Sequence, residues 1–279
     1  MRLDVKKTYK LFIGGAFPRS ESGRSYQIQD SKRNFIANPA QASRKDLRDA
    51  VLAAKNSQAQ WSSATAYNRG QILYRIAEIM EGRSDQFVAE IMALEGATPK
   101  AALKQVQEAI DTWVWYAGWT DKISSTAGST NPIAGPYYNF TIPEPLGVVG
   151  IFAEQKSSLL GVVRGLAPVL ASGNSAVVVA SERRPLPAIT LSECCATSDV
   201  PSGVINILTG VTSELAPWMA SHMEVDGIDI SGLDPKNDAD IRKSGTENLK
   251  RIHRFKSENS PERILSFMEY KTVWHPIGI

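Results

Sequence analysis

Cysteine is nearly absent from this chain of 279 residues, since the only two, Cys194 and Cys195, are neighbours. Adjacent cysteines rarely pair with each other, so neither a disulfide framework nor a zinc site of the CxxC type is expected. Histidine is also scarce, and His222, His253 and His275 are too far apart in the sequence to suggest a metal site. A chain without disulfides suits a reducing compartment, and we predict a cytoplasmic location.

An excess of charge and long apolar runs are missing too. The chain carries 31 lysines and arginines against 29 aspartates and glutamates, which gives a formal net charge of +2. This balance gives no support for nucleic acid or a membrane surface as a partner. No run of about 18 apolar residues exists, so no transmembrane helix is expected. The opening decapeptide MRLDVKKTYK lacks the apolar segment of a signal peptide.

The most informative stretch lies in the middle of the chain, where residues 147–179 read GVVGIFAEQKSSLLGVVRGLAPVLASGNSAVVV. An apolar strand leads into an apolar helix and a second apolar strand follows, which is the order of a βαβ unit. Strand and helix signals go on alternating through GVINILTG, SELAPWMASHM and VDGIDIS. The alternation predicts an α/β fold, with a Rossmann-like parallel sheet and flanking helices.

The region before this unit is expected to be largely helical. Ser43 is a suitable N-cap for a helix that begins RKDLRDAV. Two more helices are expected within residues 67–96, and Gly96 ends the second of them. Pro99 can open the next helix, since proline is favoured in a first turn.

Tryptophan is clustered on that last helix, at Trp113, Trp115 and Trp119. Such a cluster can line a binding site. Trp113 and Trp119 are six residues apart, however, and do not share one helix face cleanly. We therefore expect core packing and a contact between subunits in preference to a ligand site.

Several pieces of the chain, in this order, resemble the aldehyde dehydrogenase superfamily. They are LFIGGAF, ALEGATPKAALKQVQEAIDTWVWYAG, EPLGVVGIF, LAPVLASGNSAVVVASERRPLP, VPSGVINILTG and VDGIDISG, and the closing YKTVW is similar to the end of that family. The chain also looks like the degenerate second module of two-module aldehyde dehydrogenases.

The resemblance implies a domain plan with one large part missing. Residues 1–125 correspond to the N-terminal strands and helices of the dinucleotide-binding-type domain, and residues 146–250 to its Rossmann-like part. Residues 126–145 correspond to a β arm, and residues 251–279 to a linker and a C-terminal oligomerisation strand. No segment corresponds to the catalytic domain, since NLKRI at 248–252 resembles the strand that enters it and the family's tail follows almost at once.

The family's reaction needs a cysteine thiolate, a glutamate that activates water and an amide that holds the oxyanion. No cysteine follows Cys195, and Cys194 and Cys195 are expected to be small buried residues on a helix. Lys156 stands at the position of the family's oxyanion asparagine. It either still offers hydrogen-bond donors there or belongs to a solvated turn that has diverged from the family's sequence. The resemblance therefore leaves no catalytic residue.

Dinucleotide binding is expected to be weak at best. Val179 occupies the position of the family's ribose-binding lysine, whereas Glu182 is retained. In the phosphate-binding turn, Asp234 adds a negative charge and Pro235 removes an amide donor. The residues left to bind NAD or NADP are Phe152, Ala153, Glu182, Ser231 and Gly232. No metal is expected.

Two functions remain open on the sequence. In the first, the chain is a catalytically inactive subunit that acts as a structural or regulatory partner of a full-length aldehyde dehydrogenase. In the second, it is an NAD(P)-binding oxidoreductase subunit that contributes to aldehyde oxidation within a complex. In both, residues 130–145 and 264–279 are expected to pair with the full-length enzyme or with a second copy by strand addition.

Overall fold

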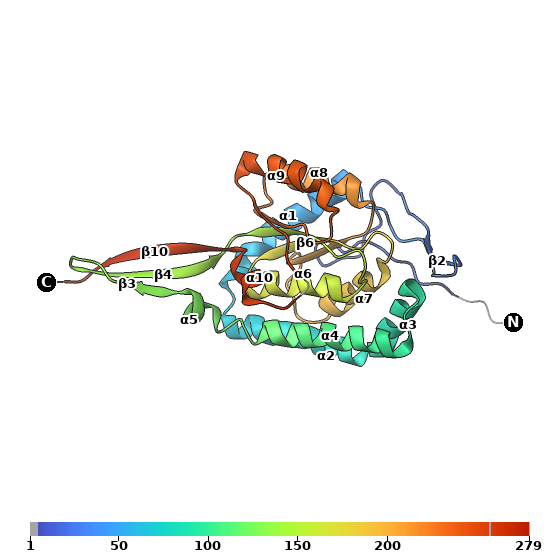
Figure 1. Cartoon of the computed structure of the whole chain (residues 1–279), viewed down its shortest axis with the longest axis horizontal. Helices are drawn as coiled ribbons and strands as arrows, with labels where there is room; N and C mark the ends of the chain where they lie inside the picture. Colours follow the sequence, from blue (N-terminus) through green and yellow to red (C-terminus); the bar gives the residue numbers. More distant parts are fainter. Residues whose placement is uncertain (1–4, 257, 279) are drawn as a thin grey trace.

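A computed structural model describes residues 5–256 and 258–278 and consists of an α/β body with a long β arm (Figure 1). The body is built on a five-stranded sheet in the order β7-β6-β5-β8-β9, with every pair parallel. Its strands are β5 (Val148–Phe152), β6 (Ser175–Val179), β7 (Ile205–Leu208), β8 (Gly227–Asp229) and β9 (Arg251–His253). The parallel sheet expected from the alternating pattern is confirmed, and β9 extends it beyond residue 250.

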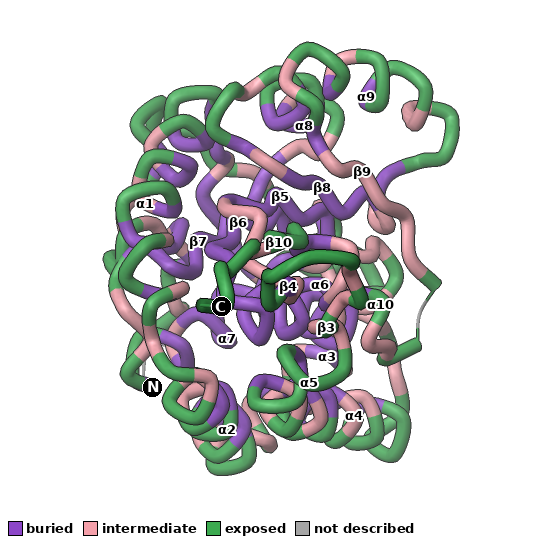
Figure 2. The backbone as a smooth tube through the Cα atoms, turned by 90° about the vertical axis from the view of Figure 1, so that its left-hand side faces the viewer, coloured by how far each residue is buried: buried purple, intermediate pink, exposed green. Residues whose placement is uncertain are grey.

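Helices cover both faces of this sheet (Figure 2). One face carries α1 (Arg44–Ser63), α8 (Thr212–Ser221) and α9 (Asp238–Gly245), and the other carries α6 (Leu160–Ala171) and α7 (Leu186–Ala196). An outer layer of α2 (Ala66–Gly82), α3 (Ser84–Glu95) and α4 (Pro99–Ala117) lies against α6 and α7. Along β6, Val177 and Val179 point into one core, and Ala176 and Val178 into the other. This alternation explains why β6 is apolar at successive positions.

The helix boundaries follow the expected capping residues. The Ser43 hydroxyl accepts hydrogen bonds from Lys45 N and Asp46 N, and the Asp46 carboxylate accepts one from Ser43 N. Gly96 ends α3 in the left-handed conformation, with φ of 66°. Pro99 opens α4 after the N-cap Thr98. Local sequence therefore sets these ends.

The arm is a three-stranded antiparallel sheet that projects from the body (Figure 1). It follows the short helix α5 (Ile123–Ala127) and consists of β3 (Ser129–Asn131), β4 (Tyr137–Pro145) and β10 (Met268–Pro276), in the order β10-β4-β3. Strands β4 and β10 pair over nine residues each, from Tyr137 with Pro276 to Pro145 with Met268. The C-terminal segment therefore returns across the body and completes the arm.

Between β8 and β10 the chain forms several short elements that no sequence pattern announced. They are the 3-10 turns η1 (Pro235–Asn237) and η2 (Thr246–Asn248) and the helix α10 (Pro261–Leu265), besides α9, whereas β9 overlaps NLKRI, the segment that resembles a strand of the family. Near the N-terminus, a small hairpin pairs β1 (Ile28–Gln29) with β2 (Phe35–Ala37). No helix within the described ranges is long and apolar enough to cross a membrane.

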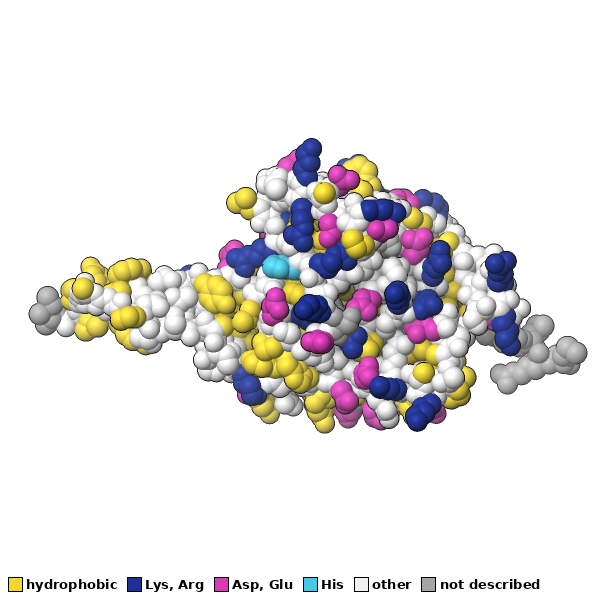
Figure 3. Space-filling model, in the orientation of Figure 1, with side chains coloured by type: hydrophobic (Ala, Val, Ile, Leu, Met, Phe, Trp, Pro, Cys, Tyr) yellow, Lys and Arg dark blue, Asp and Glu magenta, His cyan; other side chains and the backbone are white. Residues whose placement is uncertain are grey.

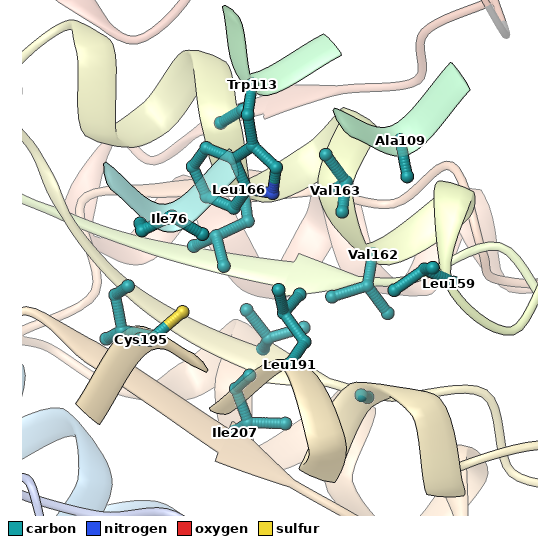
Figure 4. Packing of buried hydrophobic residues seen from close by; sticks show 14 of the residues in the cluster. Ile76, Ala109, Trp113, Leu159, Val162, Val163, Leu166, Leu191, Cys195 and Ile207 are labelled. Atoms are coloured by element: carbon teal, nitrogen blue, oxygen red, sulfur yellow. The ribbon is translucent and has the colours of Figure 1, made fainter. Parts of the chain in front are cut away.

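Trp113 and Cys195 lie in the core between α4, α6 and α7 (Figure 4). Trp113 is fully buried, whereas Trp115 and Trp119 are partly buried, with ring centroids 5.5 Å apart. Cys194 is fully buried as well, and burial raises the pKa of its thiol to about 11. The expectation that both cysteines are buried structural residues is confirmed.

Candidate cofactor site at the carboxyl edge of the sheet

Parallel strands bring their carboxyl ends to one edge of a sheet, and in α/β folds ligands bind there. The segments that follow β5, β6 and β8 meet at this edge. They contain Ala153 to Ser158, Ala180 to Arg184 and Ile230 to Asp234, respectively. The fold therefore brings together the residues that the sequence placed in a dinucleotide site.

Gln155 ties the turn after β5 to the loop after β6. Its amide group donates to Ala153 O at 2.9 Å, and its side-chain oxygen accepts from Glu182 N at 2.9 Å. The backbone oxygen of Gln155 also accepts from the Ser181 hydroxyl at 3.1 Å. The turn is thus held against the sheet edge. Sequence reasoning missed this role, because no local pattern links a glutamine to a loop so far along the chain.

Lys156 lies in the turn after β5. Its side chain is exposed, and its backbone oxygen accepts a hydrogen bond from Arg184. Cys194 and Cys195 lie on α7, buried in the core of the body, with raised thiol pKa values because of burial. A buried thiol with a raised pKa is not a nucleophile at neutral pH.

Glu182 occupies a polar corner that suits sugar hydroxyls. Its half-buried carboxylate accepts a hydrogen bond from Thr212 N, at the start of α8, over 3.0 Å. The Thr212 hydroxyl is buried and has no partner within the described part of the chain. Burial, together with the charge of Glu182, raises the pKa of Tyr26, whose hydroxyl is also buried. A carboxylate beside buried hydroxyls can accept and donate hydrogen bonds to a ribose.

The position at which the family has a ribose-binding lysine carries no polar side chain in this chain. Val179 is fully buried at the end of β6, and its backbone oxygen accepts from Ala153 N at 3.0 Å. Phe152 and Ala153 are buried as well, at 1% exposure each. These three residues pack the sheet edge and present no charged or polar side chain to a ligand.

Gly232 is required by close packing at this edge. Its N–H donates to Phe152 O at 3.0 Å, and a Cβ built on Gly232 would lie 2.0 Å from Ala153 O. Only glycine fits there without displacing backbone. Its neighbour Ser231 donates its hydroxyl to Asp229 and accepts from Phe255 N. Both residues therefore have structural roles that do not depend on a cofactor.

The phosphate end of the site already holds a carboxylate. Asp234 caps η1 and accepts a hydrogen bond from Lys236 N at 3.1 Å, and the Lys236 ammonium lies 2.9 Å from it. These hydrogen bonds lower the pKa of Asp234, so it is ionised at neutral pH. Pro235 contributes no N–H. The residues present thus fit the ribose end of a dinucleotide and do not fit its pyrophosphate.

A buried ion pair between α10 and the end of β8 lies at the same edge of the sheet. The Arg263 guanidinium on α10 lies 3.7 Å from the Asp229 carboxylate, and each side chain is 3% exposed. Arg263 also donates to Arg164 O at 3.0 Å and to Glu258 O at 3.1 Å. This pair was not predicted, since Arg263 lies in a stretch without a recognisable motif and is far from Asp229 along the chain. Arg263 lies beyond NLKRI, the segment at which the resemblance expects the chain to enter a catalytic domain.

Comparison with known proteins matches this chain to one family. The profile of the Aldehyde dehydrogenase family matches residues 17–265. The chain belongs to the aldehyde dehydrogenase family. Among curated relatives, cytosolic 10-formyltetrahydrofolate dehydrogenase of Xenopus tropicalis is 33% identical over 258 residues, and human retinal dehydrogenase 2 is 32% identical over 256 residues. Each alignment covers 90% of this chain, but 28% and 48% of the relative, respectively.

Solved structures of the family share its fold. The NAD⁺ complex of the Bacillus cereus aldehyde dehydrogenase superposes with a TM-score of 0.83 at 24% identity, over 88% of this chain and 50% of that one. HpcC from Thermus thermophilus gives a TM-score of 0.84 at 26% identity, over 89% of this chain and 48% of that one. The chain therefore spans about half the length of the solved structures it resembles. Among the residues that the structure describes, no cluster of three metal-ligating side chains occurs.

Proposed function

We propose that this chain is a catalytically inactive aldehyde dehydrogenase-family subunit and acts as a structural or regulatory partner of a full-length aldehyde dehydrogenase. One observation carries the proposal: both cysteines of the chain are buried in the core, on α7, so neither faces the carboxyl edge as a thiol nucleophile. Lys156, at the oxyanion position, then has no intermediate to stabilise. A cytosolic location accords with the resemblance to cytosolic 10-formyltetrahydrofolate dehydrogenase of Xenopus tropicalis.

The arm offers the means of assembly. β10 is an edge strand, and none of the described strands pairs with its outer side. An exposed edge of nine residues is a template for strand addition by another chain. A full-length family member has a catalytic sheet to which β10 can add, whereas the residues of this chain that the structure describes form no such sheet.

A second candidate is a subunit that binds NAD or NADP and contributes to aldehyde oxidation within a complex. Glu182 favours it, because its carboxylate lies beside the buried Thr212 hydroxyl in a corner suited to ribose. Asp234 opposes it, because an ionised carboxylate lies where the pyrophosphate would bind. Both observations are compatible with weak binding of a nucleoside that carries no phosphate.

Co-purification tests the proposed function. Tagged chain and a full-length aldehyde dehydrogenase from the same organism would be co-expressed, and the complex is expected to elute with both chains in fixed proportion. A truncated chain without residues 269–279 should lose the partner. The truncation keeps Ile264, Phe267 and Met268, which are buried in the body, so the remainder should stay folded by circular dichroism.

The other edge of the arm provides a matched control. Thr130→Pro alters β3 and leaves β10 intact, so this variant should retain the partner. If the truncated chain retained the partner fully, β10 would not be the docking strand. Failure of the intact chain to retain any full-length aldehyde dehydrogenase would refute the partner role.

A further inference from the structure

The outer edge of β10 is complementary to itself. Backbone hydrogen bonds run from Ile277 N to Pro136 O and from Leu146 N to Phe267 O, so odd-numbered residues of this segment face β4. Backbone groups alternate between the two sides of a strand. The N–H and C=O groups of Tyr270, Thr272 and Trp274 therefore face outward, away from the rest of the arm.

We propose that two copies of this chain dimerise by antiparallel pairing of β10 with β10 of the second copy, about a two-fold axis at Thr272. The proposal concerns the strand that the proposed function uses for docking, and it rests on the chain in isolation. In this register Tyr270, Thr272 and Trp274 pair through their outward N–H and C=O groups, and Met268 lies opposite Pro276, which has no N–H, while Met268 O already accepts from Arg251. Moving the axis by one residue in either direction leaves residues at the strand ends unpaired.

Charge selects the same register. Glu269 faces His275 of the second copy, and the imidazole can donate a hydrogen bond to the carboxylate. A register centred on Lys271 places two ammonium groups opposite each other, and one centred on Val273 places Lys271 opposite His275. Like charges directly opposite each other destabilise a strand pair. The register at Thr272 thus avoids the repulsion between the two lysines in the register at Lys271, and it sets Glu269 opposite His275, which the register at Val273 does not.

Aromatic side chains add to the pairing on the other face of the strand. Tyr270 and Trp274 are 53% and 59% exposed, although both are large and apolar. In the register at Thr272, each Tyr270 lies opposite Trp274 of the second copy, and aromatic cross-strand pairs are favourable. Trp274 also contacts Tyr137 on β4, at 6.0 Å between ring centroids, so the pair would extend an existing aromatic contact. Hydrophobic side chains gather on the arm in Figure 3.

Sedimentation of the purified, untruncated chain of 279 residues tests this pairing. At about 50 μM the chain should sediment as a dimer, at twice 30.5 kDa, since such an interface is expected to hold in the micromolar range. Thr272→Pro removes the central outward N–H and should give a monomer. Thr130→Pro places proline on the opposite edge, where N–H also faces outward, and should remain dimeric.

A charge exchange tests the register itself. Glu269→Lys should raise the dimer dissociation constant by about tenfold, since each dimer contains the contact twice. Adding His275→Glu to this variant should restore dimerisation, because lysine and glutamate then face each other. A monomeric parent chain, equal loss in Thr130→Pro and Thr272→Pro, or no recovery in the double variant would each overturn the proposal.

These results are separable from the partner role. A monomeric parent chain that still co-purifies with a full-length aldehyde dehydrogenase would overturn the self-pairing alone. A β10-mediated dimer that retains no such enzyme would overturn the proposed function alone. One β10 edge cannot do both at once, so excess full-length enzyme should convert dimers into mixed pairs.

Discussion

Asp234 has two effects in the turn after β8. It caps η1 by accepting from Lys236 N, and it brings a charge to the place where a dinucleotide would bring its phosphates. Its hydrogen bonds with Lys236 keep it ionised, because they lower its pKa. One residue thereby stabilises a local turn and opposes an anionic ligand.

The charge of Asp234 leads to a prediction for the affinity of the chain for nicotinamide dinucleotides. The unmodified chain should show no binding of NAD or NADP tighter than roughly 100 μM in titration calorimetry. Asp234→Ser together with Pro235→Thr should improve any residual binding about tenfold, since repulsion is relieved and an N–H donor returns. Asp240→Ser removes the same charge from an exposed site on α9 and should change nothing. A low-micromolar constant in the unmodified chain would contradict this description of the turn.

At the scale of elements, the segment from Arg254 to Leu265 joins the sheet to the arm. The Tyr116 hydroxyl on α4 accepts from Ser260 N at 3.3 Å, and Arg263 on α10 reaches both α6 and Asp229 at the end of β8. Ser260 and Arg263 thus contact three layers of the body.

The Arg263–Asp229 pair predicts a large change in stability. Arg263→Met leaves the Asp229 carboxylate buried without its partner and should lower the free energy of unfolding by about 3–5 kcal/mol. Adding Asp229→Asn should recover part of that loss, because the amide oxygen can still accept from Ser231 N. Arg48→Met removes an exposed ion pair and should cost about 0–1 kcal/mol. Urea unfolding measures all three. Equal costs for Arg263→Met and Arg48→Met would show that the buried pair has no such weight.

Sequence patterns anticipated the elements whose information is local. The apolar runs of β5 and β6, the N-cap at Ser43 and the C-cap at Gly96 follow from side-chain periodicity and capping chemistry. The short elements between β8 and β10 could not be anticipated in the same way. They depend on contacts between residues far apart in the chain, such as Arg263 with Asp229. For the same reason, the sequence did not predict the hydrogen bonds of Gln155 or the hydrogen bond from Thr212 N to Glu182 at the candidate site.

As a whole molecule, the chain has the α/β body and the arm of its family, and it spans about half the length of the family structures it resembles. The carboxyl edge of the sheet is folded and polar at Glu182, Asp234 caps η1 in the turn that the resemblance assigns to the phosphates, and both cysteines are buried in the core. On the arm, the outer side of β10 pairs with none of the described strands. The proposed role in assembly rests on these features.

Aldehyde oxidation by the purified chain is the most direct test of this account. The chain would be incubated with NAD or NADP and a panel of short and aromatic aldehydes, and reduced nicotinamide would be measured against a blank without protein. The account predicts no reduced nicotinamide above the blank, with Cys195→Ala identical to the unmodified chain. Turnover by the unmodified chain that disappears in Cys195→Ala would contradict it.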